Sequence, residues 1–412
     1  MRCPRSRRGA FCAGAAVLFL LICAVSTEAG DRVLAGRKWI VVHEKGCEAY
    51  DSVLFAKNGR TVQAVNRSGK KQDFPVHACI ALMQRKPGAL QDTGKRGFYV
   101  QLADGDMLMV RQPVFRGKKL LFSHGVWGRI DIDARHLYML FRPEIRTGSI
   151  EADFTGLVLK NGDAAQGTIS SLDGDMILVE MEGIGKIPVG SLSNVSKAVF
   201  STRGKTAEEN SGKNHTVIHL VTGEIISGTP VKGGKGVWYI QTAWSRKPVR
   251  IYTRYVESAL FAGGKQFLSD TKPKNIKSSV WIGRSFGYSR DRSILGSPLS
   301  VRGFTAAKGI GLHSGTFITY DLSLPEKPFL FCGLAGIDSE AFYPGARTGL
   351  TVYIDGKPVK RVQLSSGGGM VPVFIRVKSG SKSLSFKTDA GSKGSVSGNV
   401  NLMWSSLLYG SL

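Results

Sequence analysis

The 412-residue chain contains few side chains whose types and spacing suggest catalytic or metal-binding chemistry. His313 lies in KGIGLHSGTFITYDL, residues 308–322, between glycines and an alternating run. A zinc site needs further His, Cys or carboxylate ligands at suitable spacing, and none accompanies His313. Thr316, Ile318 and Tyr320 alternate with side chains of the opposite face, as is typical of a β-strand. We therefore expect His313 to have a structural role at the end of a strand.

Other catalytic signatures are weaker still. HEKGC, residues 43–47, begins like a zinc-peptidase helix, but Cys47 occupies the position of the second histidine and the flanking residues are strand-like. The chain has no P-loop and no dinucleotide-binding glycine motif. Paired carboxylates for glycoside hydrolysis meet only in space, yet acids are depleted and the chain lacks room for a hydrolase barrel. We expect no catalytic activity and no catalytic or metal-binding residues.

The composition indicates an all-β protein with anionic partners. There are 56 Lys and Arg residues against 31 Asp and Glu, which gives a formal net charge of +25. The chain has 51 glycines, only 15 prolines and no long periodic Leu- or Ala-rich run, which favours many short strands joined by tight turns. Acidic glycans and phospholipid surfaces are therefore the expected partners.

Residues 1–29 have the pattern of a signal peptide. Four arginines precede an apolar run that ends in small residues at Thr27 and Ala29. Removal of this segment would lower the net charge to about +22, because it contains four Arg and one acid, Glu28. We expect a secreted, periplasmic or cell-envelope protein, and export makes nucleic acid the least natural anionic partner.

Three cysteines follow the signal segment, at positions 47, 79 and 332. Their odd number and wide spacing exclude a disulfide scaffold. A bridge between Cys47 and Cys79 and a pair of separate buried thiols both remain open.

The region after the signal segment repeats itself. Residues 156–180 and 217–241 share one frame, in which a strand is followed by a turn glycine, an acid and then Gly-Thr. The glycine is expected to supply the positive φ of a tight hairpin. Two further copies begin near residues 52 and 99, and the aligned turn glycines are Gly59, Gly105, Gly162 and Gly223. The spacing of these glycines is irregular, at 46, 57 and 61 residues.

Units of about fifty residues favour small SH3-like or Sm-like barrels, which are marginally stable alone. Repeats 1 and 2 would pair within residues 30–147, and repeats 3 and 4 within residues 148–263. Residues 264–279 are polar, Lys-rich and without alternation, so they predict a linker.

Residues 280–412 predict a separate β-sandwich. Phe329–Asp338 form a near-continuous apolar strand, and Asp355-Gly356 is a strong hairpin signal between two alternating runs. Seven or eight short strands of this kind indicate an antiparallel jelly roll. The predicted fold is therefore all-β, with small SH3-like or Sm-like barrel repeats followed by a jelly-roll β-sandwich.

Four blocks carry a family resemblance: residues 295–322, GLAGID, LTVYIDGKPV and a late tryptophan, Trp404. Together they resemble the NPCBM domain, a carbohydrate-binding module of the glycoside hydrolase family 98 type with a galactose-binding-like fold. The resemblance implies a jelly roll that binds sugars, sometimes with a structural calcium. Met403 replaces an expected acid, so only a core role is carried over to Trp404. More weakly, the repeats resemble strand units of exported proteins of Planctomycetes-type bacteria.

Sugar recognition needs flat aromatic faces for the apolar sides of pyranoses and planar polar groups for pairs of hydroxyls. Two loops of the C-terminal region contain such side chains. The predicted carbohydrate-binding residues are Tyr288, Arg290, Asp291, Glu340, Phe342, Tyr343 and Arg347. In the second loop, Pro344-Gly345 is expected to form a rigid turn.

The sequence thus predicts an exported, non-catalytic carbohydrate-binding protein in which basic β-repeats serve as a spacer or an anchor to an anionic surface. One alternative is a structural envelope protein whose jelly roll makes protein–protein contacts. Another is an accessory subunit of a glycoside hydrolase. The sequence identifies neither the sugar nor the oligomeric state.

Overall fold

The computed structural model describes most of the chain after the expected signal segment. Described are residues 38–85, 97–142, 154–173, 176–201, 215–234, 236–261, 265–278, 287–322, 328–340, 343–392 and 398–409. These residues form strands, turns and single-turn 3₁₀ helices, which confirms the all-β class. Within these ranges no helix is long and apolar enough to cross a membrane. The expected signal peptide, residues 1–29, lies outside them.

Four similar antiparallel units occupy residues 39–261, and each ends in a 3₁₀ helix followed by a closing strand. Unit 1 contains β1 (Trp39–His43), β2 (Gly46–Tyr50), β3 (Ser52–Ala56), β4 (Thr61–Val65), β5 (Lys71–Pro75), η1 (Val76–Ala78) and β6 (Cys79–Gln84). Unit 2 contains β7 (Phe98–Leu102), β8 (Met107–Arg116), β9 (Lys119–His124), β10 (Gly128–Asp133), η2 (Ala134–His136) and β11 (Leu137–Phe141).

The other two units follow the same order. Unit 3 contains β12 (Gly156–Leu159), β13 (Ala164–Gln166), β14 (Thr168–Asp173), β15 (Met176–Met181), β16 (Gly185–Gly190), η3 (Leu192–Asn194) and β17 (Val195–Val199). Unit 4 contains β18 (Thr216–Leu220), β19 (Ile225–Gly234), β20 (Val237–Gln241), β21 (Val249–Tyr252), η5 (Thr253–Tyr255) and β22 (Val256–Phe261).

The first turn has one geometry in units 2, 3 and 4. Gly105, Gly162 and Gly223 have φ values of 92°, 96° and 81°, which confirms the predicted positive φ. In each unit the glycine N–H donates to the last carbonyl of the first strand, at 2.9–3.1 Å. The residue after that strand donates to the last residue of the 3₁₀ helix. These pairs are Ala103 to His136, Lys160 to Asn194 and Val221 to Tyr255.

The hydrogen bond from the first strand to the 3₁₀ helix also identifies the turn glycine of unit 1, and it differs from the predicted one. There the N–H of Glu44 donates to the carbonyl of Ala78 at 3.1 Å, so the equivalent turn glycine is Gly46. The predicted choice, Gly59, is wrong, because Gly59 lies in the turn between β3 and β4. With Gly46 in place, the four turn glycines are 59, 57 and 61 residues apart, so the repeat is nearly regular.

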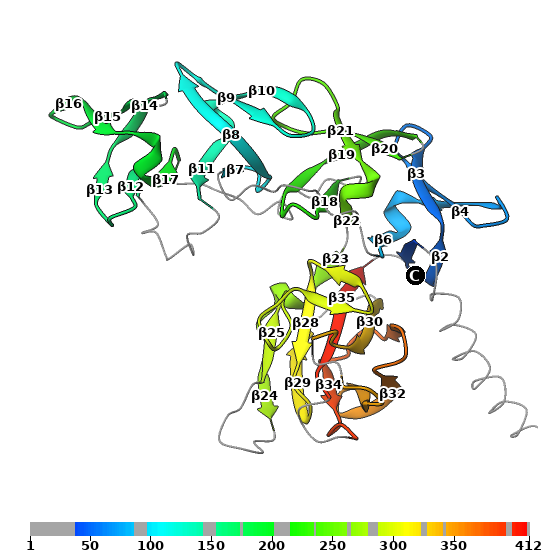
Figure 1. Ribbon diagram of the computed structural model, residues 1–412. Coiled ribbons are helices and arrows are strands. Elements are labelled where there is room, and N and C mark those ends of the chain that lie inside the picture. Colours follow the sequence, from blue (N-terminus) through cyan, green and yellow to red (C-terminus); the bar gives the residue numbers. More distant parts are fainter. Residues whose placement is uncertain are drawn as a thin grey trace, which may run out of the picture.

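The units pair differently from the prediction. The closing strands β11 and β17 join units 2 and 3, with Leu140 opposite Ala198. The closing strands β6 and β22 join units 1 and 4, with Leu82 opposite Ala259. Single bridges from β8 to β14 and to β19 attach unit 2 to units 3 and 4. The spatial order is therefore 3–2–4–1, and the chain returns to place unit 4 between units 2 and 1 (Figure 1).

This order gives the backbone groups of the closing strands hydrogen-bond partners. A closing strand left at an edge would present unpaired backbone N–H and C=O groups. Pairing β6 with β22 and β11 with β17 uses those groups.

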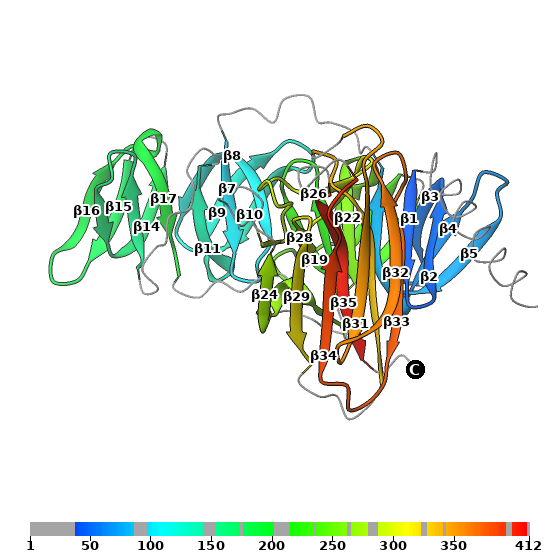
Figure 2. The same ribbon diagram turned by 90° about the horizontal axis from the view of Figure 1, so that it is seen from below.

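Residues 265–409 form a two-sheet sandwich that lies beside units 1 and 4 (Figures 1 and 2). The repeat-facing sheet has the order β25 (Tyr288–Arg290), β28 (Gly309–Leu312), β35 (Val400–Tyr409), β30 (Phe329–Ile337) and β33 (Val371–Val377), with β23 (Lys265–Phe267) on β35. The distal sheet has the order β24 (Asn275–Ser278), β29 (Thr316–Asp321), β34 (Ser383–Thr388), β31 (Arg347–Ile354) and β32 (Lys357–Ser365). η6 (Leu268–Asp270) follows β23, and β26 (Leu299–Val301) pairs with β27 (Phe304–Ala306).

The segment expected as a linker is part of the sandwich. Within residues 264–279, β23 pairs with β35 of one sheet and β24 pairs with β29 of the other. Both are edge strands, and Asn275, Ile276 and Lys277 of β24 are exposed, which explains their polar, non-alternating sequence. The Asp355-Gly356 hairpin is confirmed, because both residues have positive φ, 50° and 75°.

Strand β30 of the repeat-facing sheet is buried on both faces. Phe329 and Phe331 of β30 pack between the two sheets, in one apolar cluster. Leu330 and Cys332 point the other way, into a second cluster shared with units 1 and 4. The apolar run of β30 therefore reflects a strand in the middle layer of three.

Trp404 belongs to that second cluster and is fully buried, which confirms its predicted core role. The thiols of Cys47, Cys79 and Cys332 are free, so Cys47 and Cys79 are not bridged.

Candidate functional site

Three of the predicted sugar-binding residues lie in the loop after β30 or at the first residue of β31, and we call residues 338–347 the rim loop. Glu340, Tyr343 and Arg347 are exposed, and 55% of Tyr343 is accessible to solvent. Gly345 has a φ of 75°, and the N–H of Ala346 donates to the Tyr343 carbonyl at 2.9 Å, as a tight turn requires. Phe342 lies outside the described residues.

A buried carboxylate anchors the rim loop. Asp338 is fully buried, and its Oδ1 accepts hydrogen bonds from the Glu340 N–H at 3.3 Å and from Asn401 Nδ2 at 3.1 Å. Burial raises the pKa of Asp338, and the nearby Glu340 carboxylate adds to this. The start of the loop is thereby fixed to β35.

The end of the rim loop is also fixed. The Arg347 N–H donates to Ser392 Oγ at 3.0 Å, and the Ser392 N–H donates to the Arg347 carbonyl at 2.8 Å. The exposed guanidinium of Arg347 thus extends from an ordered backbone, close in sequence to the Tyr343 ring. An exposed aromatic ring can receive the apolar face of a pyranose, and an exposed guanidinium can bind its hydroxyls.

The other predicted sugar-binding residues, Tyr288, Arg290 and Asp291, lie on β25 or directly after it, and they make different contacts. Tyr288 and Arg290 are joined by a bond from Arg290 Nε to the Tyr288 hydroxyl, at 3.2 Å. Asp291 is instead bonded to the backbone: its Oδ1 accepts from the Gly309 N–H at 3.0 Å, and its Oδ2 pairs with Lys308 at 3.3 Å. Asp291 therefore holds the edge of the sheet.

Strand register relates the two groups. Tyr288 lies opposite Leu312, Leu312 opposite Val400, and Val400 opposite Ile337, the last residue of β30. Tyr288 is therefore at the same end of the sheet as the rim loop but three strands away, roughly 14 Å at the usual strand spacing. A single monosaccharide does not span both groups.

His313 lies between β28 and β29, at the strand end where the sequence placed it. It is half-buried, and its Nδ1 is 2.9 Å from the Ser314 carbonyl oxygen. Among the described residues, no three His, Cys, Asp or Glu side chains gather closely enough to hold a metal ion. The described residues therefore offer no cluster of carboxylates for a calcium ion.

Residues 264–406 match the sequence model of the NPCBM/NEW2 domain family. This match confirms the resemblance seen in the sequence. It also begins at the segment that forms β23, in agreement with the strand pairing. A search of curated proteins found no match to the chain.

The comparison with solved structures finds CBM51 modules. The CBM51 of a Clostridium perfringens GH95, in complex with methyl-galactose, is 20% identical, with 35% of this chain and 99% of that chain covered and a TM-score of 0.31. CBM51-2 with the INT domains of C. perfringens ZmpB, in complex with GlcNAc, is 17% identical over 56% of this chain and 43% of that chain, with a TM-score of 0.30. The tandem CBM51 modules of Sp3GH98 from Streptococcus pneumoniae are 12% identical over 62% and 88%, with a TM-score of 0.30.

Proposed function

We propose that this protein binds carbohydrate without catalysis, and that the rim loop of its C-terminal sandwich makes the contact. The match of residues 264–406 to the NPCBM/NEW2 domain carries the proposal. The exposed Tyr343 and Arg347 supply the surface, because they offer a ring face and planar donors on an anchored loop.

We further propose that the chain is exported and that the four basic units act as a spacer or an anchor to an anionic surface. The signal-like residues 1–29 and the net charge of +25 support this part. Because unit 1 and unit 4 are packed against the sandwich, the rim is presented on a rigid base.

The test is titration calorimetry of residues 30–412 with galactosides and GlcNAc, the sugars held by the CBM51 structures. Tyr343→Ala should weaken binding by about tenfold, since an aromatic platform contributes on the order of 1 kcal/mol or more. Val359→Ala is the matched control, because Val359 is also exposed (47%) but lies near the hairpin at the other end of the distal sheet.

Equal binding by wild type and Tyr343→Ala would remove the rim loop from the proposal. Absence of binding across a broad array of neutral and acidic glycans would reject the function itself.

A further inference from the structure

A cavity of about 790 Å³ lies between units 2 and 4, and we call it the inter-unit cleft. One wall is β10 and the turn before it, and the other is the loop from β20 to β21, residues 241–250. Its volume is within the range of small-molecule sites. It is remote in sequence from the rim loop and belongs to the repeats.

The cleft carries a surplus of positive charge. The basic side chains that line it are Lys119, Arg129, Arg135, Arg246, Lys247 and Arg250. Two carboxylates also line it, and both are paired: Asp131 with Lys119 at 2.6 Å and Asp133 with Arg135 at 3.9 Å. These pairs leave four cations in excess.

Asp131 is held in an ion pair with Lys119. Its hydrogen bond from Lys119 is the main cause of a lowered pKa, and Arg246 acts in the same direction. Asp131 is therefore ionised at neutral pH and compensates one cation. Arg129, Arg246 and Lys247 are exposed around it.

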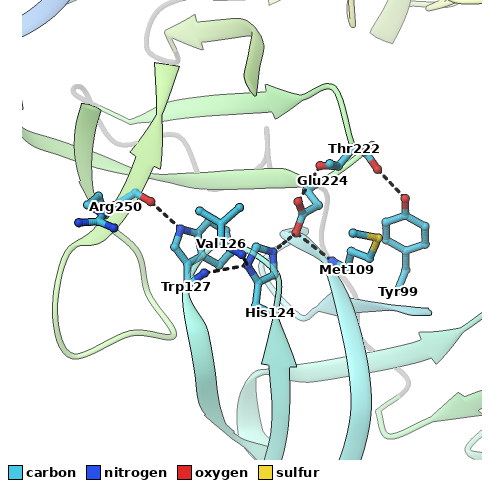
Figure 3. Close-up of polar contacts among 8 residues, drawn as sticks. All are labelled: Tyr99, Met109, His124, Val126, Trp127, Thr222, Glu224 and Arg250. Atoms are coloured by element: carbon cyan, nitrogen blue, oxygen red, sulfur yellow. Dashed lines mark hydrogen bonds and ion pairs between the residues drawn. The ribbon is translucent and has the colours of Figure 1, made fainter. Parts of the chain in front are cut away.

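An indole lies among these charges. Trp127 lines the cleft, and one of its faces is stacked on the His124 imidazole, with ring centroids 3.9 Å apart and planes 13° from parallel (Figure 3). Its Nε1 donates to the Arg250 carbonyl across the cleft, at 2.5 Å. Because His124 covers one face, the indole offers the cleft its remaining surface in a fixed orientation.

The support beneath the indole is buried and bridges the two units. His124 Nδ1 accepts from the N–H groups of Val126 and Trp127, at 3.1 and 3.2 Å. The imidazole proton is then on Nε2, which donates to Glu224 Oε1 at 2.7 Å. Glu224 also accepts from the Met109 N–H and the Thr222 hydroxyl, so its carboxylate has three donors (Figure 3). The cleft is thus preorganised.

We propose that the inter-unit cleft binds an acidic oligosaccharide, one that carries carboxylate or sulfate groups. Guanidinium groups bind such oxyanions through paired hydrogen bonds, and an indole surface packs against the apolar side of a sugar ring. Single-stranded nucleic acid sites instead place several aromatic platforms in succession. In this cleft the second indole, Trp244, is buried and donates its Nε1 hydrogen to Asp106.

The experiment uses residues 30–412 and three hexasaccharide probes: a heparin-derived one with sulfates, an oligogalacturonate with carboxylates and neutral maltohexaose. Calorimetry should show binding of an acidic probe and not of the neutral one. The double variant Arg129→Gln/Arg246→Gln should weaken that binding at least about tenfold, because each lost charged contact removes a sizeable part of the affinity. The probe that binds more tightly distinguishes sulfate from carboxylate.

Two matched variants separate a built site from general charge. Arg376→Gln removes an exposed arginine of the sandwich, far from the cleft in the fold, and should change the affinity less than twofold. Trp127→Leu should weaken binding even at 0.5 M salt, where charge attraction is screened, whereas Trp127→Phe should retain part of it.

An equal loss in Arg376→Gln and in the double variant would overturn the proposal in favour of diffuse attraction. A hexanucleotide that binds as tightly as the acidic sugars, with the same dependence on Trp127, would overturn the assignment to glycan. The result is independent of the rim loop, because Tyr343→Ala should leave the binding of acidic probes unchanged.

Discussion

Lys265 Nζ donates a hydrogen bond to the carbonyl oxygen of Cys79 at 2.5 Å, across the boundary between the sandwich and unit 1. The same ammonium donates to the Phe261 carbonyl of unit 4 at 2.9 Å. One side chain on β23 thus joins three parts of the molecule. Burial lowers the pKa of Lys265 to about 8.

This lowered pKa predicts a stability that rises with pH in the alkaline range. Between pH 8 and 10.5 the unfolded chain keeps the Lys265 proton and the folded chain releases it, so the free energy of unfolding increases with pH. The gain is at most about 3 kcal/mol. Thermal unfolding from pH 7.5 to 10.5 should show the wild type gaining stability relative to Lys265→Met. Parallel curves for the two proteins would contradict the prediction.

His219 predicts a loss of stability in acid, with the same sign of pH dependence as Lys265. Its Nε2 is buried without a hydrogen-bond partner, and burial, with the nearby Lys308 ammonium, lowers its pKa to about 4. Between pH 6.5 and 4 the unfolded chain binds a proton that the folded chain excludes, so the free energy of unfolding decreases as the pH is lowered through this window.

Comparison of wild type with His219→Gln over this window isolates the effect. The variant should lose less stability than the wild type between pH 6.5 and 4, by at most about 3 kcal/mol. Other carboxylates and histidines titrate equally in both proteins and cancel in the difference. A difference that stays constant with pH would show that His219 does not titrate there.

We predict that replacement of Asp106 by asparagine, which has the same shape, destabilises the protein. The side chain is fully buried, and its two oxygens accept from the Ser227 N–H and from Trp244 Nε1, both at 2.7 Å. Burial, then the neighbouring Asp104, hold its pKa well above the usual range. Even a protonated carboxyl keeps a lone pair on each oxygen, whereas the amide nitrogen of asparagine has none and would face a donor.

Asp106→Asn should therefore lower the free energy of unfolding by about 1–3 kcal/mol, measured in urea at neutral pH. Asp131→Asn is the control, because its exposed pair with Lys119 is expected to contribute less than about 1 kcal/mol. A similar, small loss in both variants would refute the role given to Asp106.

The Gly-Thr step of the repeat predicts a fourth stability effect. A Cβ at Gly228 would lie 2.2 Å from the carbonyl oxygen of Gln241 on the paired strand. Gly228→Ala must shift that strand and should destabilise by about 1–3 kcal/mol. Gly234→Ala is matched to it, since it lies on the same strand with no atom within 4 Å of the added carbon, and it should be nearly neutral. Equal melting temperatures for the two variants would exclude the close approach.

Sequence reasoning was right where the signal is local. The positive φ of Gly162 and Gly223 and the Asp355-Gly356 hairpin are properties of a few adjacent residues. It was wrong for unit 1, because the strand after the true turn glycine, Gly46, is divided into β2 and β3 and the copy had lost its pattern.

Long-range arrangement was not encoded in any such pattern. The edge strands β23 and β24 have the composition of a linker: β23 is only three residues long, and the exposed β24 needs no apolar alternation. The inter-unit cleft joins residues of units 2 and 4, which become neighbours only because the chain returns between units 1 and 2. Its surplus of arginines was visible in the sequence only as a net charge.

The three-layer packing also predicts how the sandwich behaves alone. A fragment of residues 264–412 would expose the face of the repeat-facing sheet that now packs on units 1 and 4, including Leu330, Leu334 and Leu408. An exposed apolar face of this kind favours self-association. Size-exclusion chromatography with light scattering should therefore find oligomers or aggregates for the fragment and a defined species for residues 30–412. The double variant Leu330→Gln/Leu408→Gln should shift the fragment towards monomer. A fragment that is monomeric at about 100 μM without these changes would show that this face stays soluble without units 1 and 4.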